Sequence, residues 1–182
     1  EEAKKAGIEK FIFITGRNKD AINNHFDHSY ELEDKLDIDN RQSDIEKSSS
    51  WLPDPGKVIF IRQQQPLGLG HAVWCARDCI ADDEPFAVIL ADELIMNKGG
   101  QGNFLLQMIE QFYAKGSKSP VIGVDEVNPD QIDKYGIIKC DFDQKITGMT
   151  EKPAIGTVDS NLAIVGRYIL TPQIFDHLKD FK

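Results

Sequence analysis

The stretch Phe86-Ala-Val-Ile-Leu-Ala-Asp92 indicates the fold. Its unbroken apolar run from Phe86 to Leu90 is typical of a strand buried on both faces of a parallel sheet. Asp92 follows just beyond the carboxyl end of this strand. Ligands of open α/β sheets bind there, so its carboxylate is well placed to hold a metal ion. Alternatively, Asp92 caps the turn or a helix beyond it. The stretch alone leaves both interpretations open.

Alternating strands and helices extend the α/β prediction over most of the chain. We expect strands at 11–15, 58–61 and 121–124 and helices at 19–26, 72–80 and 104–112, with a loop at 96–102. The polar stretch 30–50 is interpreted as a surface helix followed by a loose connection through 48–50. From residue 135 the pattern changes to three strands, at 135–140, 146–150 and 162–170. This pattern predicts a doubly wound sheet with a β-rich portion appended.

Length, composition and charge limit the classes of function. The chain has 182 residues, which suit one α/β domain, and 41% hydrophobic with 28% charged residues argue against disorder. A net charge of −9, without a Lys/Arg cluster on one face, disfavours nucleic acids and anionic membranes as partners. Because neither a signal peptide nor a membrane span is apparent, we expect a cytoplasmic protein.

The three cysteines show no spacing of a disulfide framework or a zinc site. Cys75 and Cys79 lie in a predicted helix and Cys140 on a predicted strand. We expect all three to be buried as small apolar residues. Glu1 to Gly7 resemble the last turns of a helix with a glycine C-cap, and the chain stops inside another helical pattern. These ends predict that the sequence is a fragment.

A polar segment after the strand at 58–61 carries the strongest candidate ligand-binding residues. Gly68 and Gly70 lie between a strand and a helix, where they allow the backbone to approach a ligand closely. The Gln63 amide offers one acceptor and two donors, which suits a nucleobase edge. Taken alone, the two glycines are better explained by a tight turn, and His71 is expected to be structural. Arg17, in the loop after 11–15, could reach a phosphate, although an arginine there is usually solvated.

Four features occur in a defined order: Arg62-Gln63 with Gly68-Leu69-Gly70-His71; Ile89 to Asp92; Tyr135-Gly136; and Glu151-Lys152-Pro153 followed by Ser160 to Tyr168. In isolation, Glu151-Lys152-Pro153 is an ordinary surface turn. Together the four features resemble the bacterial UTP–glucose-1-phosphate uridylyltransferases, also called UDP-glucose pyrophosphorylases. The resemblance extends over nearly the whole chain, from about Ala6 to His177.

The resemblance implies a fold and a reaction. The fold is an α/β nucleotidyltransferase-type (Rossmann-like) mixed sheet flanked by helices, here a single incomplete domain over 1–182. Residues 1–127 form its nucleotide-binding part and residues 128–182 a β-rich sugar-binding part. The implied reaction converts UTP and glucose 1-phosphate into UDP-glucose and pyrophosphate with Mg²⁺. The full-length protein is expected to be a homo-oligomer.

The resemblance also implies roles for six residues of this chain. The Gln63 amide and the Gly68 backbone read the uracil, and Asp92 is a ligand of the catalytic Mg²⁺. Gly136 lets the backbone approach the glucose, Glu151 hydrogen-bonds sugar hydroxyls, and Lys152 contacts phosphate. Asp92 and Lys152 are thus the expected catalytic residues. A carboxylate suits a hard cation or hydroxyl groups, and an ammonium suits phosphate.

The sequence departs from the family pattern in several places, and two alternatives to the uridylyltransferase interpretation stay open. The family's opening strand, with its Gly-x-Gly-Thr-Arg loop and downstream lysine, is absent, as is the C-terminal region with a second metal-binding acid. Ala91 stands where many relatives have proline, which should not affect the metal. We therefore expect the 182 residues alone to be inactive. The alternatives are another sugar-1-phosphate nucleotidyltransferase, thymidylyl or guanylyl, and a non-catalytic nucleotide-sugar-binding module.

Overall fold

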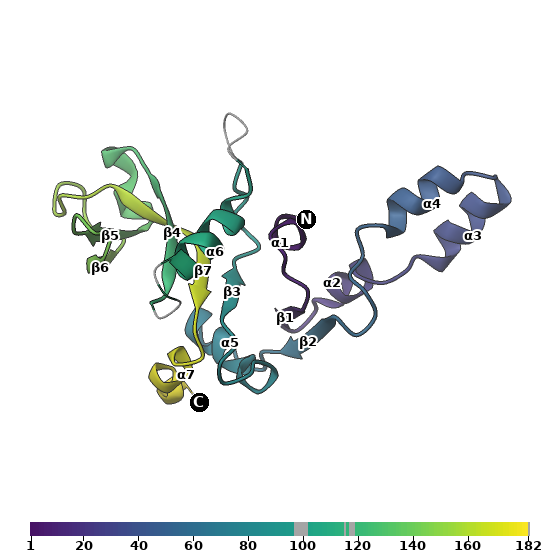
Figure 1. Cartoon of the computed structure of the whole chain (residues 1–182), viewed down its shortest axis with the longest axis horizontal. Helices are drawn as coiled ribbons and strands as arrows, with labels where there is room; N and C mark the ends of the chain where they lie inside the picture. Colours follow the sequence, from purple (N-terminus) through teal and green to yellow (C-terminus); the bar gives the residue numbers. More distant parts are fainter. Residues whose placement is uncertain (97–101, 115, 117–118, 182) are drawn as a thin grey trace. The chain divides into compact units, whose positions relative to one another are not determined.

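The chain forms two compact units in a computed structural model that describes residues 1–96, 102–114, 116 and 119–181. Unit 1 comprises Glu1–Asp82 and Pro172–Lys182, and unit 2 comprises Asp83–Thr171. Figure 1 shows the elements of both units. Most of the loop predicted at 96–102 lies outside the described residues. In the described part, no helix has the length and apolar character needed to span a membrane.

Unit 1 is built around a parallel pair of strands, β1 and β2. Their register runs from Phe11 opposite Val58 to Thr15 opposite Arg62, so both carboxyl ends meet at one edge. The elements of unit 1 are α1 (Glu2–Lys5), β1 (Phe11–Thr15), α2 (Asp20–His25), α3 (Tyr30–Ile38), α4 (Gln42–Ser49), β2 (Val58–Arg62), α5 (Leu69–Cys75), the 3₁₀ helices η1 (Arg77–Cys79) and η3 (Lys179–Phe181), and α7 (Ile174–His177).

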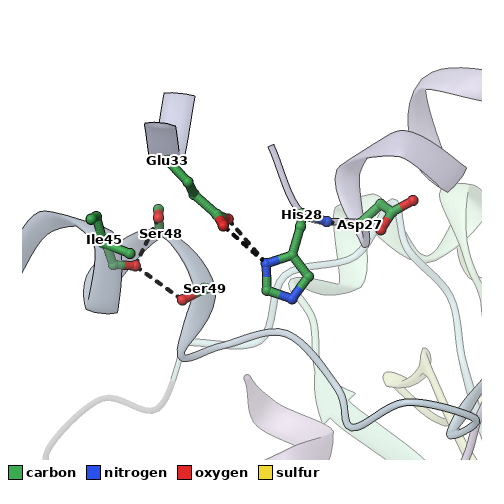
Figure 2. A network of polar contacts seen from close by, with 6 residues as sticks. All are labelled: Asp27, His28, Glu33, Ile45, Ser48 and Ser49. Atoms are coloured by element: carbon green, nitrogen blue, oxygen red, sulfur yellow. Dashed lines mark hydrogen bonds and ion pairs between the residues drawn. The ribbon is translucent and has the colours of Figure 1, made fainter. Parts of the chain in front are cut away.

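Helix α4 corrects the prediction of a loose connection through 48–50. Arg41 forms an ion pair with Asp44, with 2.7 Å between Arg41 Nη2 and Asp44 Oδ2, and holds the pKa of that carboxyl below its usual value. At the other end, the hydroxyls of Ser48 and Ser49 donate to the Ile45 carbonyl at 2.8 and 3.0 Å (Figure 2). Such local hydrogen bonds are compatible with a helix, so the serines do not mark a loop here.

Helix α3 is the surface helix predicted from Tyr30, and it packs against α4. Leu36 is its one buried residue, with 8% of its surface exposed. Immediately before α3, the His28 ring contacts the Glu33 carboxylate, with Nδ1 3.1 Å from Oε1 (Figure 2). This contact ties the first turn of α3 to the segment that follows α2.

Unit 2 is organised on its longest strand, β7. Strand β4 pairs along one edge of β7, while β3 and β5 follow each other along the opposite edge and β6 pairs with β5, all antiparallel. The elements of unit 2 are β3 (Phe86–Ile89), α6 (Phe104–Ala114), β4 (Val121–Glu126), the 3₁₀ helix η2 (Pro129–Lys134), β5 (Gly136–Cys140), β6 (Ile146–Glu151) and β7 (Leu162–Leu170).

The prediction for the strand at 86–90 was right in position and wrong in surroundings. Strand β3 runs antiparallel to β7, and Phe86, Ala87 and Val88 are half-buried. A short apolar run reports burial but carries no information about the direction of the neighbouring strand. Here that neighbour comes from the β-rich portion of the chain, which was expected to be appended to the sheet rather than paired with β3.

Helix α6 covers the sheet of unit 2 by packing on β4 and β7. Its buried residues Leu105, Met108 and Phe112 recur at helical spacing, as the sequence predicted. A second cluster under β5 consists of Ile132, Ile137 and Ala163. Across the two units, strands and helices are combined as an α/β fold with mixed pairing. The predicted fold class, a mixed sheet flanked by helices, is therefore confirmed.

Two smaller predictions needed correction. Helix α5 begins at Leu69 rather than Ala72, because Gly68 with φ 93° is its N-cap, and it ends at Cys75 with the 3₁₀ turn η1 beyond it. The three cysteines are free but half-buried, whereas full burial was expected.

Candidate functional site

The carboxyl ends of β1 and β2 form a polar surface in unit 1. An open cleft of about 410 Å³ lies there, lined by Arg17, Asn18, Asp20, Arg62, Gln63 and Gln64. The backbone N–H of Gln63 donates to the Thr15 carbonyl at 2.8 Å, which extends the pairing of the two strands by one bond. The sequence therefore delivers Gln63 to the edge where ligands of parallel sheets bind.

The Gln63 amide is held in one orientation by its neighbours. Its Nε2 donates to the Gly68 carbonyl at 3.1 Å and lies 2.8 Å from Nδ1 of His71. Because Nε2 is a donor in both contacts, Nδ1 of His71 accepts and Oε1 of Gln63 remains an acceptor for a ligand. His71 thus has the structural role that was expected, and that role is to orient Gln63. The sequence alone did not indicate this contact.

The predicted residues of unit 2 come together where β3 ends and β5 begins along β7. Leu90 N–H donates to the Gly166 carbonyl at 2.9 Å, and Ile137 pairs with Ala163 only three residues earlier on β7. Gly136 is paired with Glu151 of β6. We call this region, formed by Leu90–Glu93, Gly136 and Glu151–Lys152, the β3–β5 junction. It collects four of the six predicted site residues.

Gly136 leaves room for the Glu151 carboxylate. A Cβ placed on Gly136 would lie 3.1 Å from Oε2 of Glu151 and 3.2 Å from Cδ1 of Ile164. A side chain at this position would therefore displace the carboxylate or the isoleucine. Glycine at this position therefore leaves the exposed Glu151 carboxylate room beside the β5 backbone.

Lys152 adopts an unusual backbone conformation directly after Glu151. Its φ is 44°, in the left-handed region that few residues other than glycine adopt, and its N–H donates to the Tyr135 carbonyl at 3.0 Å. Such conformations persist only where surrounding contacts fix them, and they concentrate at functional sites. The backbone that carries the exposed Lys152 side chain is therefore hydrogen-bonded to Tyr135, directly before β5.

Glu93 and Tyr168 also belong to this region, although sequence reasoning gave them no role. Burial, reinforced by the nearby charges of Glu93 and then Glu151, raises the pKa of the Tyr168 hydroxyl. The hydroxyl therefore remains a hydrogen-bond donor at neutral pH. The sequence offered only weak indications of these two residues. Glu93 directly follows Asp92, and Tyr168 is the last residue of the segment 160–168 that carries the family resemblance.

Asp92 is an exposed turn residue after β3, and the capping interpretation finds no support among the described residues. The next described helix, α6, begins at Phe104, and its N-terminal cap is Asn103, whose side chain accepts from Leu106 N–H at 3.1 Å. The hydrogen bonds and ion pairs of the described residues do not include the Asp92 carboxylate. This carboxylate is therefore available to a ligand.

The Asp92 turn fits a magnesium ion of the kind that is bound jointly with phosphates. Mg²⁺ is commonly held by one or two carboxylates together with waters and substrate phosphates. No group of three or more metal-ligating side chains occurs in the part of the chain that the structure describes. A closed, all-protein metal cage is thus not present there, whereas the single exposed carboxylate of Asp92 is compatible with an ion that is shared with a phosphate.

Comparisons with known proteins show what the whole chain is similar to. The UTP–glucose-1-phosphate uridylyltransferase of Bacillus subtilis (strain 168) is 42% identical over 186 residues, covering 99% of this chain and 61% of that protein. A UTP-bound UGPase from Acinetobacter baumannii superposes with a TM-score of 0.87 at 36% identity, covering 98% and 64% of the two chains. A UDP-glucose pyrophosphorylase complexed with UDP-glucose gives 0.78 at 34% identity, covering 98% and 64%.

The chain is shorter than the curated relatives that it matches. It spans about 61% of the length of the curated relatives it matches. The model of the nucleotidyl transferase family matches residues 1–182, which is the whole chain. The chain therefore belongs to the nucleotidyl transferase family.

Proposed function

We propose that the protein containing this chain transfers a uridylyl group from UTP to glucose 1-phosphate, giving UDP-glucose and pyrophosphate. The observation that carries the proposal is the β3–β5 junction, where Gly136 of β5 and Glu151 of β6 lie with Asp92 and Lys152, which follow β3 and β6 in the chain. The proposal is also supported by relatives named as UTP–glucose-1-phosphate uridylyltransferases, which are about 40% identical to this chain over nearly its whole length.

The uracil is recognised by Gln63 and Gly68. Oε1 of Gln63 is the atom left to accept from the N3–H of uracil, because Nε2 is already bonded to Gly68 and His71. The Gly68 N–H, on an exposed residue with φ 93°, can donate to an adjacent uracil oxygen. An acceptor beside a donor matches the uracil edge. Arg17 and Arg62, which line the same cleft as Gln63, suit an anionic ligand.

The sugar phosphate is bound at the β3–β5 junction. Glu151 accepts from glucose hydroxyls, and Gly136 allows the sugar to approach the β5 backbone. Lys152 neutralises phosphate charge with its exposed ammonium. A phosphate oxygen of glucose 1-phosphate attacks the α-phosphorus of UTP in line, and pyrophosphate leaves. Because no covalent enzyme intermediate is needed, the protein contributes positioning and charge neutralisation.

Asp92 is the residue of this chain that holds Mg²⁺. When bound, the ion supplies charge neutralisation at phosphate oxygens and fixes their positions. In functional terms, residues 1–127 form the nucleotide-binding part and residues 128–182 the sugar-binding part. We further propose a homo-oligomeric enzyme that acts in the cytoplasm, where UTP and sugar phosphates are held.

We predict that Glu151 and Lys152 affect different kinetic constants of the full-length protein. Glu151→Gln should raise KM for glucose 1-phosphate by roughly 10-fold or more, with a much smaller change for UTP, since a hydrogen bond to a charged group contributes about 1.5–3 kcal/mol. Lys152→Met should lower kcat by about 10²-fold, because its charge acts on the reacting phosphates.

Steady-state kinetics with each substrate varied separately would measure this difference. Lys139→Met is the matched control, because Lys139 is exposed on β5 outside the β3–β5 junction, and it should retain both constants. If the Glu151 and Lys152 variants raised KM for the two substrates equally, Glu151-Lys152-Pro153 would be a structural turn and the division of roles would be wrong.

A further inference from the structure

A buried arginine lies behind the Asp92 turn. Arg167 on β7 is opposite Ile89 of β3, and only 3% of its surface is exposed. It is the one charged residue that is buried in the described part of the chain. A buried guanidinium is costly unless its donors are satisfied, so the groups that it contacts indicate why it is there.

The guanidinium of Arg167 holds both ends of the Asp92 turn. Nη1 donates to the Leu90 carbonyl at 3.1 Å, and Nη2 donates to the Glu93 carbonyl at 3.0 Å. Nη1 also donates to the Gly166 carbonyl at 3.2 Å. The planar fork of arginine presents donors in a fixed geometry, which a single ammonium does not reproduce. The backbone on either side of Asp92 is therefore fixed to β7 through one side chain.

Gly166 lets the same turn pack directly against the β7 backbone. Its φ is 43°, in the left-handed region, and it lies within β7 where the register with β4 shifts between Ile122 and Val124. A Cβ at this position would lie 2.9 Å from Leu90 Cβ and 3.1 Å from both Cδ and Oε2 of Glu93. A side chain here would push the turn away from β7. Gly166 thus provides the space in which Arg167 can reach both carbonyls.

We infer that Arg167, together with Gly166, is the positioning device for the Asp92 carboxylate. Arg167 does not touch substrate in this role; it acts by restricting the backbone of Leu90–Glu93, so that Asp92 meets the metal–phosphate group in one orientation. The inference rests on the proposed role of Asp92 as the magnesium ligand. Its structural part, the restriction of the turn, stands independently of that role.

The test uses the full-length protein with Arg167→Met and Arg167→Lys. In the metal-free protein, we expect amide hydrogen exchange at 90–93 to rise at least 10-fold in Arg167→Met while exchange in β5 and β6 is unchanged. The Mg²⁺ concentration for half-maximal activity should rise by about 10–100-fold, the usual effect of losing a residue that orients a metal ligand. Arg167→Lys should recover little, because the lysine ammonium does not reproduce the planar fork that reaches both carbonyls.

Gly166→Ala provides a second variant in case Arg167→Met does not fold. It keeps the guanidinium but crowds the turn, so exchange at 90–93 and the Mg²⁺ requirement should change in the same direction. A folded Arg167→Met or Gly166→Ala protein with wild-type exchange at 90–93 and a wild-type Mg²⁺ requirement would overturn the inference.

Asp92→Asn separates this inference from the proposed function. If Asp92→Asn leaves the Mg²⁺ requirement unchanged, the metal assignment of Asp92 fails, and Arg167 then has no metal ligand to position. If Asp92→Asn abolishes the Mg²⁺ response while Arg167→Met leaves it unchanged, the proposed function stands and the positioning role is wrong.

Discussion

Replacing Asp92 by asparagine should reduce Mg²⁺-dependent turnover of the full-length protein by about 10²–10³-fold, because losing one group that stabilises transition-state charge has an effect of this size. Asparagine has nearly the same shape as aspartate but lacks the charge. The Asp92 carboxylate is exposed, and no hydrogen bond or ion pair to it occurs among the described residues, so the fold should be unaffected. The measurement is pyrophosphate release over a Mg²⁺ titration, with thermal unfolding of the same sample.

Asp83→Asn is the matched control for this variant. Asp83 is also an exposed turn residue, but it precedes β3, whereas Asp92 follows it. Asp83→Asn should therefore retain full turnover. A folded Asp92→Asn protein with turnover near that of the wild type would remove Asp92 from the metal site and restore the interpretation that it caps a turn.

Replacing Leu105 by alanine should lower the free energy of unfolding by about 2–5 kcal/mol, the range found when buried leucines are truncated. Leu105 has 0% of its surface exposed and lies on the face of α6 that packs on β4 and β7. The methyl groups lost from this site leave a cavity in a close-packed core. Chemical denaturation of the purified protein, followed by circular dichroism, measures the change.

Leu106 offers a matched comparison on the same helix. Leu106 has 38% of its surface exposed, so Leu106→Ala removes the same atoms from a position where water can take their place. Leu106→Ala should therefore destabilise the protein much less than Leu105→Ala. Equal effects would mean that α6 does not present the Leu105 face to the sheet.

Local patterns in the sequence were enough to predict most elements of the fold. The stripe of Leu105, Met108 and Phe112 predicted α6, and the apolar runs at 11–15 and 162–170 predicted β1 and β7 with correct bounds. Strand direction was not predictable for β3, because its antiparallel partner β7 begins more than seventy residues later. Helix α4 was missed because it has no buried apolar stripe, and its serines, which are typical of loops, bond back to the Ile45 carbonyl within the helix.

The candidate site was predictable in its residue types but not in its supporting contacts. Asp92, Gly136 and Glu151 were identified from motifs, and the structure brings them to one junction. His71, which orients Gln63, and Arg167, which holds the Asp92 turn, depend on contacts between residues that no local pattern connects. The substrate-binding and catalytic roles of the six predicted residues remain predictions that the variants above test.

The most direct test of the proposed function is an assay of the full-length protein with glucose 1-phosphate and each of UTP, dTTP, GTP, CTP and ATP in turn, with nucleotide sugar and pyrophosphate quantified together. We predict equimolar UDP-glucose and pyrophosphate from UTP, at a rate well above that with any other nucleotide, and no product without Mg²⁺. The 182-residue chain assayed in parallel should form none. A preference for dTTP or GTP, or binding of UDP-glucose without any turnover by the full-length protein, would contradict the proposal.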